Sequence, residues 1–390
     1  MLGCWTGCLP QRALFVQREL HGPGDSSRSY DVARTEKAFA LVVKGSQGRR
    51  SGEEMPRFAR LVASHVKYVF TSNAHVYVFG GELKPRQPRD DDIFVIPIKH
   101  QDGNDTTVTK VTTSTEASRP SPRVGSAVAK LGTKLYFFSG RGGEAMAPVK
   151  EQGALWVFDT SENDWKLESP SADQAYPEAR SYHAMTCDGE KTIYVHAGCP
   201  EKGRLADLWA YDTHAKTWKE LAGAPGTSRG GPSIAFADGK LWRMNGFDGE
   251  KEVGGSVDCY DPHSNTWSSK TFDADGKAGP GARSVATLLP VKVGGKTYLV
   301  TLFGESDPSS LGHQGAGKML SDAWAYDISA DKWQQIETEV QGGGPAPAAR
   351  GWFDADVIEA SGGEAIVVNG GLAEQNERLG DTWLLSFTNP

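Results

Sequence analysis

Short apolar runs bounded by glycine and aspartate recur along most of the chain. One complete cycle starts with the run 126–131, turns at Gly132 and Thr133, and continues through the run 135–138. A loop rich in glycine and proline follows, and the cycle ends with the run 155–159 and Trp165. Runs of this length between turn residues are typical of β-strands. The pattern therefore predicts an all-β chain assembled from repeated four-stranded units.

Four of these units end in the same way, with an aromatic residue, an aspartate, five further residues and a tryptophan. They are Phe158-Asp159…Trp165, Tyr211-Asp212…Trp218, Tyr260-Asp261…Trp267 and Tyr326-Asp327…Trp333. The gaps between successive tryptophans are 53, 49 and 66 residues. A constant local spacing within a variable period of about 50 residues predicts a kelch β-propeller with one blade per repeat. We expect the four tryptophans to pack between blades.

The repeat predicts six blades and an unusual N-terminal region. We place them near 61–118, from Ser126 to Trp165, and near 181–228, 230–282, 284–349 and 351–387. The last blade is one strand short, and an unpaired edge promotes aggregation. We therefore expect an N-terminal strand, with 39–44 as the candidate, to close the ring. Residues 1–55 form an atypical and largely disordered segment in this interpretation, and 56–390 form the propeller.

Composition and charge narrow the classes of partner. The net charge is −7 and no long run of lysine and arginine occurs, which disfavours nucleic acid and anionic membranes. The chain contains no apolar stretch near the ~20 residues that span a bilayer, and its start does not resemble a signal peptide. Five cysteines are scattered without metal-site spacing, so we expect reduced thiols in a cytoplasmic, monomeric protein.

An arginine precedes the innermost strand of every predicted blade. The six are Arg60, Arg123, Arg180, Arg229, Arg283 and Arg350. Innermost strands line the channel of a propeller, so the arginines should converge at one mouth, where planar guanidiniums suit a bound anion. The alternative is a framework role, in which each arginine pairs with a carboxylate or backbone group nearby. Trp352, two residues after Arg350, is a candidate for the channel wall.

One loop of the fifth blade carries further candidate chemistry. Glu305, Asp307 and His313 lie within nine residues. Two carboxylates and an imidazole on one face match the arrangement preferred by non-heme Fe(II), and the same residues could act as acid and base. The alternative is an Asp-Pro turn with a surface histidine. His183 is a weaker candidate base, for which a structural role on a strand is the simpler interpretation.

Several short patches resemble the kelch specifier proteins, the nitrile-specifier and epithiospecifier group, and their small fungal relatives in specialised metabolism. The patches are 79–83, PEARSYH at 177–183, 229–231, 282–285, 303–305, 350–352 and 376–378. The resemblance implies a six-bladed propeller that binds Fe(II) through Glu305 and His313. Ser309 stands where the family has its middle aspartate, and Asp307 lies two residues earlier. Arg123 and Arg229 correspond to the anion-contacting arginines, with Arg350 and Trp352 at the same mouth.

Two functional hypotheses follow. In the first, the chain is an enzyme, similar to a lyase or isomerase, that binds a small anionic or enolic intermediate and directs its rearrangement or elimination. Arg123, Arg180, Arg229, Arg283, Arg350 and Trp352 would hold the substrate, and Glu305, Asp307 and His313 would bind Fe(II) or transfer protons. In the second, the chain is a non-catalytic scaffold that docks a protein on one face of the propeller.

Overall fold

The structure is a computed structural model that describes residues 12–18, 69–72, 75–97, 108–113, 118–171, 174–340, 344–360 and 363–387. Almost all of its elements are strands, and one turn of 3₁₀ helix, η1 (Gly312–Gln314), interrupts a loop. Within these residues the structure contains no helix with the length and apolarity needed to cross a bilayer. The predicted all-β kelch propeller fold is confirmed.

Antiparallel sheets form the body of the molecule. The first contains β2 (Val69–Ser72), β3 (His75–Phe79), β6 (Ile93–Pro97) and β7 (Thr109–Lys110). The second contains β9 (Ala127–Leu131), β10 (Lys134–Phe138), β13 (Leu155–Asp159) and β14 (Asp164–Glu168). The third contains β15 (Ala184–Cys187), β16 (Thr192–Gly198), β17 (Leu205–Asp212) and β18 (Thr217–Leu221).

The second half of the chain continues the same plan. The fourth sheet contains β19 (Ser233–Ala237), β20 (Lys240–Met244), β21 (Ser256–Asp261) and β22 (Thr266–Thr271). The fifth contains β23 (Leu289–Val293), β24 (Lys296–Leu302), β27 (Ala323–Asp327) and β28 (Lys332–Gln335). The last contains β29 (Glu337–Val340), β1 (Arg12–Arg18), β32 (Arg378–Phe387), β31 (Gly363–Leu372) and β30 (Asp354–Ala360).

Pairs of short strands form within the loops that connect the strands of these sheets. They are β4 (Glu82–Lys84) with β5 (Gln87–Pro88), β11 (Arg141–Gly142) with β8 (Arg123–Val124) and β12 (Ala147–Pro148), and β25 (Glu305–Ser306) with β26 (Lys318–Met319). These short pairings hold the loops that carry the candidate site.

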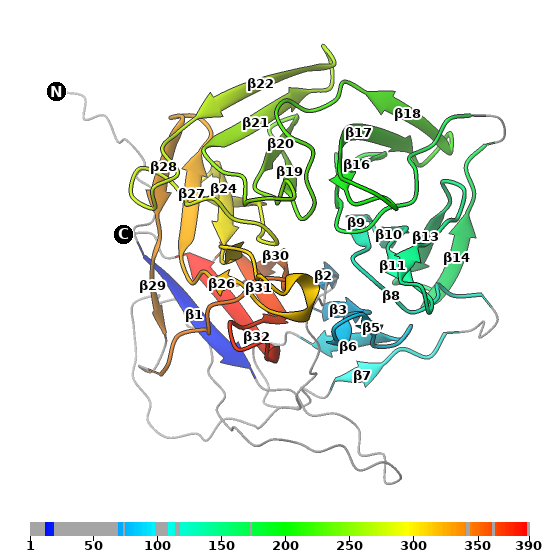
Figure 1. Ribbon diagram of the computed structural model, residues 1–390, viewed down its shortest axis with the longest axis horizontal. Coiled ribbons are helices and arrows are strands. Elements are labelled where there is room, and N and C mark those ends of the chain that lie inside the picture. Colours follow the sequence, from blue (N-terminus) through cyan, green and yellow to red (C-terminus); the bar gives the residue numbers. More distant parts are fainter. Residues whose placement is uncertain are drawn as a thin grey trace, which may run out of the picture.

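The sheets lie around a common centre, with strands such as β2, β9, β19 and β30 innermost (Figure 1). Each of the six clusters of buried apolar side chains combines residues from two neighbouring sheets, including one cluster that joins the first sheet to the last. Trp165, Trp218 and Trp333 belong to such clusters, and Trp267 packs against another. The prediction that these tryptophans pack between blades is confirmed, and burial between sheets holds the wedges together.

The repeated aspartate explains the constant spacing to the tryptophan. In the third sheet the Asp212 carboxylate accepts hydrogen bonds from the backbone N–H groups of His214 and Ala215, each at 2.9 Å. This contact stabilises a tight turn in which Lys216 adopts a φ of 56°. A hydrogen bond from Lys191 and the backbone bonds lower the pKa of Asp212 to about 2. The carboxylate therefore fixes the turn length, and the tryptophan always begins the outer strand in the same register.

An N-terminal strand occupies the outer side of the last sheet. β1 pairs antiparallel with β32 over six residue pairs, from Ala13–Phe387 to Arg18–Thr382. On its other side β1 pairs in parallel with β29, which directly follows the fifth sheet in the chain. The sequence placed the closing strand at 39–44, and those residues lie outside the described part of the chain. The strand that pairs with β32 is residues 12–18, a segment that the sequence prediction did not single out.

A buried histidine predicts loss of stability in acid. His196 is 0% exposed, and its Nδ1 lies 2.7 Å from the carbonyl oxygen of Asp207. Burial, together with the charge of Arg243, lowers the pKa of His196 well below its ordinary value. Since the unfolded state then binds a proton that the folded state does not, the free energy of unfolding should fall by about 1.4 kcal/mol per pH unit below ~6.5.

The His196→Asn variant tests this contribution, because its amide can donate to the same carbonyl without titrating. We expect urea denaturation at pH 7 and pH 5 to give a smaller loss of stability in the variant than in the wild type. Equal losses would show that His196 is not the group responsible.

Candidate functional site

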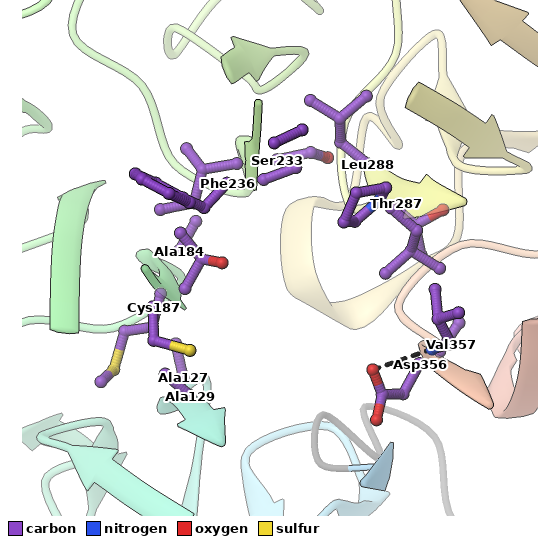
Figure 2. A pocket seen from close by; sticks show the side chains of 18 of the residues that line it. Ala127, Ala129, Ala184, Cys187, Ser233, Phe236, Thr287, Leu288, Asp356 and Val357 are labelled. Carbon is purple, nitrogen blue, oxygen red and sulfur yellow. Dashed lines mark hydrogen bonds between the residues drawn. The ribbon is translucent and has the colours of Figure 1, made fainter. Parts of the chain in front are cut away.

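A channel runs through the centre of the ring. Its cavity has a volume of about 750 Å³ and is lined by β9, β15, β19, β23 and β30. Figure 2 shows small side chains such as Ala127, Ala184 and Ser233 around the opening. The carboxylate of Asp356 points into it and accepts a hydrogen bond of 2.8 Å from the backbone N–H of Val357. Blades arranged in a ring leave a hollow along the central axis. The volume of this channel alone therefore does not indicate a functional site.

A smaller cavity of about 240 Å³ lies where the innermost strands begin, and we call it the mouth pocket. It shares Gly231 and Val285 with the channel, so the two cavities adjoin. Its lining residues are Glu82, Tyr182, Cys199, Arg204, Gly230, Gly231, Phe247, Glu252, Ser284, Val285, Glu305, Pro308, Ser309, Gly312, Gly315, Trp352, Leu372 and Arg378. Aromatic walls with a few convergent polar groups are typical of small-molecule sites.

One set of wall residues comes from a repeated position, two residues after each predicted arginine. These residues are Gly125, Tyr182, Gly231, Val285 and Trp352, and all have φ between 46° and 62°. Each backbone N–H in this series, from Tyr182 onward, donates to the carbonyl of the preceding member at 2.6–3.1 Å. Positive φ at a β-branched residue such as Val285 is strained, and such strain is concentrated at functional sites. In this arrangement Tyr182 and Trp352 both line the pocket, and their ring centroids are 5.4 Å apart.

A second set of wall residues follows a glycine at the end of each sheet's second strand. The members are Glu82, Arg141, Cys199, Phe247, Glu305 and Leu372, and all of them line the mouth pocket or the cavity beside it. Gly304, before Glu305, has a φ of 109°, and a Cβ there would lie 2.9 Å from the carbonyl oxygen of Ser284. Glycine is required by this close approach. Two positions of the repeat therefore supply half of the residues that line the mouth pocket.

The predicted anion-binding arginines lie in buried ion pairs instead. Arg123, Arg180, Arg283 and Arg350 are 0–2% exposed and bind Glu151, Asp207, Asp322 and Asp381, each through two nitrogens. Each also donates to backbone carbonyls at both ends of the loop it spans, as Arg350 does to Ala348 and Gly370. None of the four lines the mouth pocket. These contacts correspond to the framework alternative, because each of the four guanidiniums already binds a carboxylate.

Arg229 differs from its counterparts. Its guanidinium donates to the carbonyls of Thr227 and Asn245, and no described carboxylate forms an ion pair with it. The fourth sheet instead contains the buried pair Arg243–Asp258. Burial and the neighbouring charge of Arg243 lower the pKa of Arg229 to about 10. Arg60, the sixth predicted arginine, lies outside the described residues.

Three other arginines surround a side pocket of about 190 Å³ that adjoins the mouth pocket. They are Arg86, Arg141 and Arg204, and none forms an ion pair with a residue that the structure describes. Arg141 donates only to neutral oxygens of Ser181, Met146 and Pro200. Arg204 lies 4.8 Å from the centre of the Phe247 ring, and its buried Nε has no hydrogen-bond partner among the described residues. Glu82 and Glu201 also line this pocket but are paired with Arg378 and Lys150, and the charge of Asp248 acts on Arg204. The guanidiniums without ion pairs are the groups that would attract an anion.

Three carboxyl groups face the mouth pocket. Glu82 binds Arg378 at 3.2 Å, and Glu305 accepts hydrogen bonds from Gly317 N–H at 2.6 Å and Trp352 Nε1 at 2.8 Å. Glu252 accepts one from the Ser284 hydroxyl at 3.1 Å. Burial, opposed by Ser284 and reinforced by the charge of Glu305, raises the pKa of Glu252 to about 7. Burial also raises the pKa of Glu305.

The predicted iron ligands do not converge among the described side chains. Both oxygens of Glu305 are occupied by the hydrogen bonds above, and Asp307 is exposed to solvent. His313 lies in η1, and its side chain is outside the described part of the structure. Of the side chains that are described, no three from His, Cys, Asp or Glu are grouped to hold a metal. Because the His313 side chain is not described, the Fe(II) ligand set stays a prediction.

The sequence prediction thus found Glu305 and Trp352 but missed most of the pocket. Tyr182 lies in the quoted patch 177–183 and Arg378 in the patch 376–378, yet neither was selected. Arg204 and Glu252 lie in loops without a repeated motif. The repeated arginines could have located Tyr182 and Val285, because each of these pocket residues lies two positions after one of the arginines.

Comparisons with known proteins agree with the repeat pattern. The family model described as the KLHDC2/KLHL20/DRC7 Kelch-repeats domain matches residues 66–304. The chain is 28% identical, over 80% of its length and 90% of the relative's, to the N-(sulfonatooxy)prop-2-enimidothioate sulfolyase of Thlaspi arvense.

Other relatives match over shorter stretches. Tip elongation aberrant protein 3 of Schizosaccharomyces pombe is 30% identical over 28% of this chain and 12% of its own length. Human Kelch-like protein 35 is 26% identical over 34% of this chain and 23% of its own length. The chain therefore spans under a quarter of either of these two proteins.

Proposed function

The chain belongs to the kelch-repeat family, and from that premise we propose that its mouth pocket is the active site of an enzyme of specialised metabolism. The enzyme binds a small anionic or enolic intermediate in this pocket and directs its rearrangement or elimination. The observation that carries the proposal is the group of Arg86, Arg141 and Arg204, which border the adjoining side pocket without ion-pair partners among the described residues.

Charge and shape support the same class of ligand. The anionic group fits the side pocket, where Arg204 lies on the boundary shared with the mouth pocket. The remainder of the ligand fits against Tyr182, Phe247 and Trp352 in the mouth pocket. Fixed cations beside an aromatic-walled space stabilise negative charge that develops on a leaving group. This division of roles requires no metal, and no step here depends on Fe(II).

The Thlaspi arvense relative supports an elimination. Its name describes a lyase that acts on a sulfonatooxy compound, a substrate that carries a permanent negative charge. A departing anion needs a cationic acceptor, and the guanidiniums that form no ion pair with a described residue would supply one. The competing function is a protein-docking scaffold, which Kelch-like protein 35 represents among the relatives. The exposed Leu311, which is 69% accessible on the loop beside the pocket, favours that alternative.

Removing Arg204 tests the proposal. We expect Arg204→Gln to weaken the binding of methyl sulfate, followed by isothermal titration calorimetry, by about 10- to 100-fold, because a hydrogen bond to a charged group contributes about 1.5–3 kcal/mol. Lys202→Gln is the matched control, since Lys202 is exposed two residues away and lines neither pocket. This control should bind like the wild type.

The scaffold alternative gives different results. If methyl sulfate, inorganic sulfate and small carboxylates all fail to bind the wild type, the proposed anion site is wrong. Equal binding by wild type and Arg204→Gln would place the anion elsewhere. For the enzymatic role, metabolites of a deletion strain should be restored by the wild-type gene and not by Arg204→Gln at equal protein abundance.

A further inference from the structure

Glu252 is the carboxyl group of the mouth pocket whose bonding is incomplete. It lies in the loop between β20 and β21, where its backbone pairs with Phe247, and its side chain is 8% exposed. Oε1 accepts the hydrogen bond from Ser284, whereas the buried Oε2 has no partner among the described residues. Leaving a buried carboxylate oxygen without a donor costs free energy, and such exceptions call for a functional explanation.

The surrounding groups show why Glu252 differs from the other two carboxyls. Glu82 is bonded to Arg378 and to the backbone N–H of Arg86, and Glu305 is bonded to Trp352 and Gly317. The charged and titratable groups that line the pocket with Glu252 are Glu82, Tyr182, Cys199, Arg204, Glu305 and Arg378, and the charge of Asp307 also acts on it. No described cation forms an ion pair with Glu252. Glu252 thus lines the pocket with one carboxyl oxygen that has no hydrogen-bond partner among the described residues.

We propose that Glu252 is the proton-transfer residue of this site and that its carboxyl group exchanges a proton with a ligand whose anionic group is held by Arg204. This inference rests on the proposed function. In an elimination, the Glu252 carboxylate removes a proton from the ligand atom next to the bond that breaks. The electron pair of that broken bond to hydrogen forms the new π bond. The leaving group departs with its own electron pair as an anion beside Arg204, and Glu252 later returns its proton to water.

The pKa of Glu252 lies close to neutral pH, which suits this role. Since burial raises the pKa of Glu252 to about 7, both protonation states are populated at neutral pH, which favours acid–base catalysis. A bound anion adds a second negative charge near the carboxylate, so anion binding should favour the protonated form, and removal of a proton from the ligand then proceeds from the fraction of the complex in which Glu252 is ionised. Binding and protonation are thus linked in a direction that can be measured.

The test measures this linkage with methyl sulfate as the probe and does not depend on the natural substrate. Titration calorimetry in imidazole and bis-Tris, which contain no competing sulfonate or phosphate, gives the number of protons taken up on binding. The wild type should take up a fraction of a proton at pH 7, and its affinity should fall about tenfold between pH 6 and pH 9. Glu252→Gln should take up none and bind at pH 9 as the wild type does at pH 6.

Controls separate this inference from the proposed function. Glu250→Gln, an exposed neighbour in the same loop, should behave like the wild type. Proton uptake and pH dependence that persist in Glu252→Gln would overturn the inference while leaving the anion site intact. If methyl sulfate does not bind at all, the proposed function fails. ¹³C NMR of glutamate-labelled protein then decides on Glu252 alone, since a carboxyl resonance that titrates near pH 7 must vanish in Glu252→Gln. Its absence from the wild type would refute the inference.

Discussion

Replacing Arg350 by methionine is expected to lower the free energy of unfolding by about 3 kcal/mol, because the substitution leaves Asp381, whose side chain is only 18% exposed, without its partner. Arg350 is 0% exposed and binds both oxygens of Asp381 at 2.7 and 2.8 Å. Burial by itself would raise the pKa of Asp381, but the charge and hydrogen bonds of Arg350, with one from Trp383, bring it below the ordinary value. The charged pair is therefore formed in the folded state, and urea denaturation measures its loss.

Arg229 provides a control within the same repeat. It occupies the equivalent position but has no ion-paired carboxylate among the described residues, so Arg229→Met leaves no orphaned charge. We expect Arg229→Met to cost less than half as much as Arg350→Met. Binding of methyl sulfate to whatever fraction of Arg350→Met stays folded should match the wild type. A variant as stable as the wild type that no longer binds the anion would mean that Arg350 contacts the ligand instead.

The fold was predictable because its signals are local. The aspartate turn fixes six residues of spacing, and the tryptophan that follows is buried between sheets, so each blade could be identified separately. The strand at residues 12–18 could not be identified in this way. Its place is set by pairing with β32, more than 360 residues later, and no repeat motif marks a strand whose partner is so distant.

The candidate site was only partly predictable, for a different reason. The repeated arginines were recognised, but an arginine with a nearby aspartate and an arginine facing a ligand look alike in sequence. The third sheet illustrates this, because Asp207 lies 27 residues after Arg180 and binds it only once the blade is folded. Function is carried by positions where the repeat permits variation, such as Tyr182 and Trp352, which have glycine and valine as counterparts in other blades.

Among the described residues, the lack of an ion pair separates the pocket arginines Arg141 and Arg204 from four of the repeated arginines, and Arg229 is the exception. Arg141 and Arg204 lie on loops between the second and third strands of their sheets, where each blade has a different length and composition. Within the described residues these guanidiniums contact neutral groups and a ring, not acids. Arginines in ion pairs and arginines without ion pairs among the described residues therefore lie close together in the chain. Substitutions of the first kind should lower stability, and substitutions of the second kind should weaken binding.

Deleting residues 1–18 should destabilise the whole ring by about 5 kcal/mol. β1 forms six residue pairs with β32 and four with β29, and each ladder hydrogen bond contributes roughly 0.5–1.5 kcal/mol. Its removal exposes the backbone of β32 along residues 382–387 and separates β29 from the last sheet. Urea denaturation should show the loss of stability, and size-exclusion chromatography should show association through the exposed edge.

Deletion of residues 1–9 is the matched control, because it shortens the same terminus and leaves Arg12–Arg18 intact. This variant should unfold at the same urea concentration as the wild type. Equal stability of the two deletions would mean that the last sheet does not depend on β1. A selective effect of the longer deletion would instead show that the first and last segments of the chain hold the propeller closed together. Because the last sheet packs on the first through a shared apolar cluster, the loss should also weaken β2 and β3.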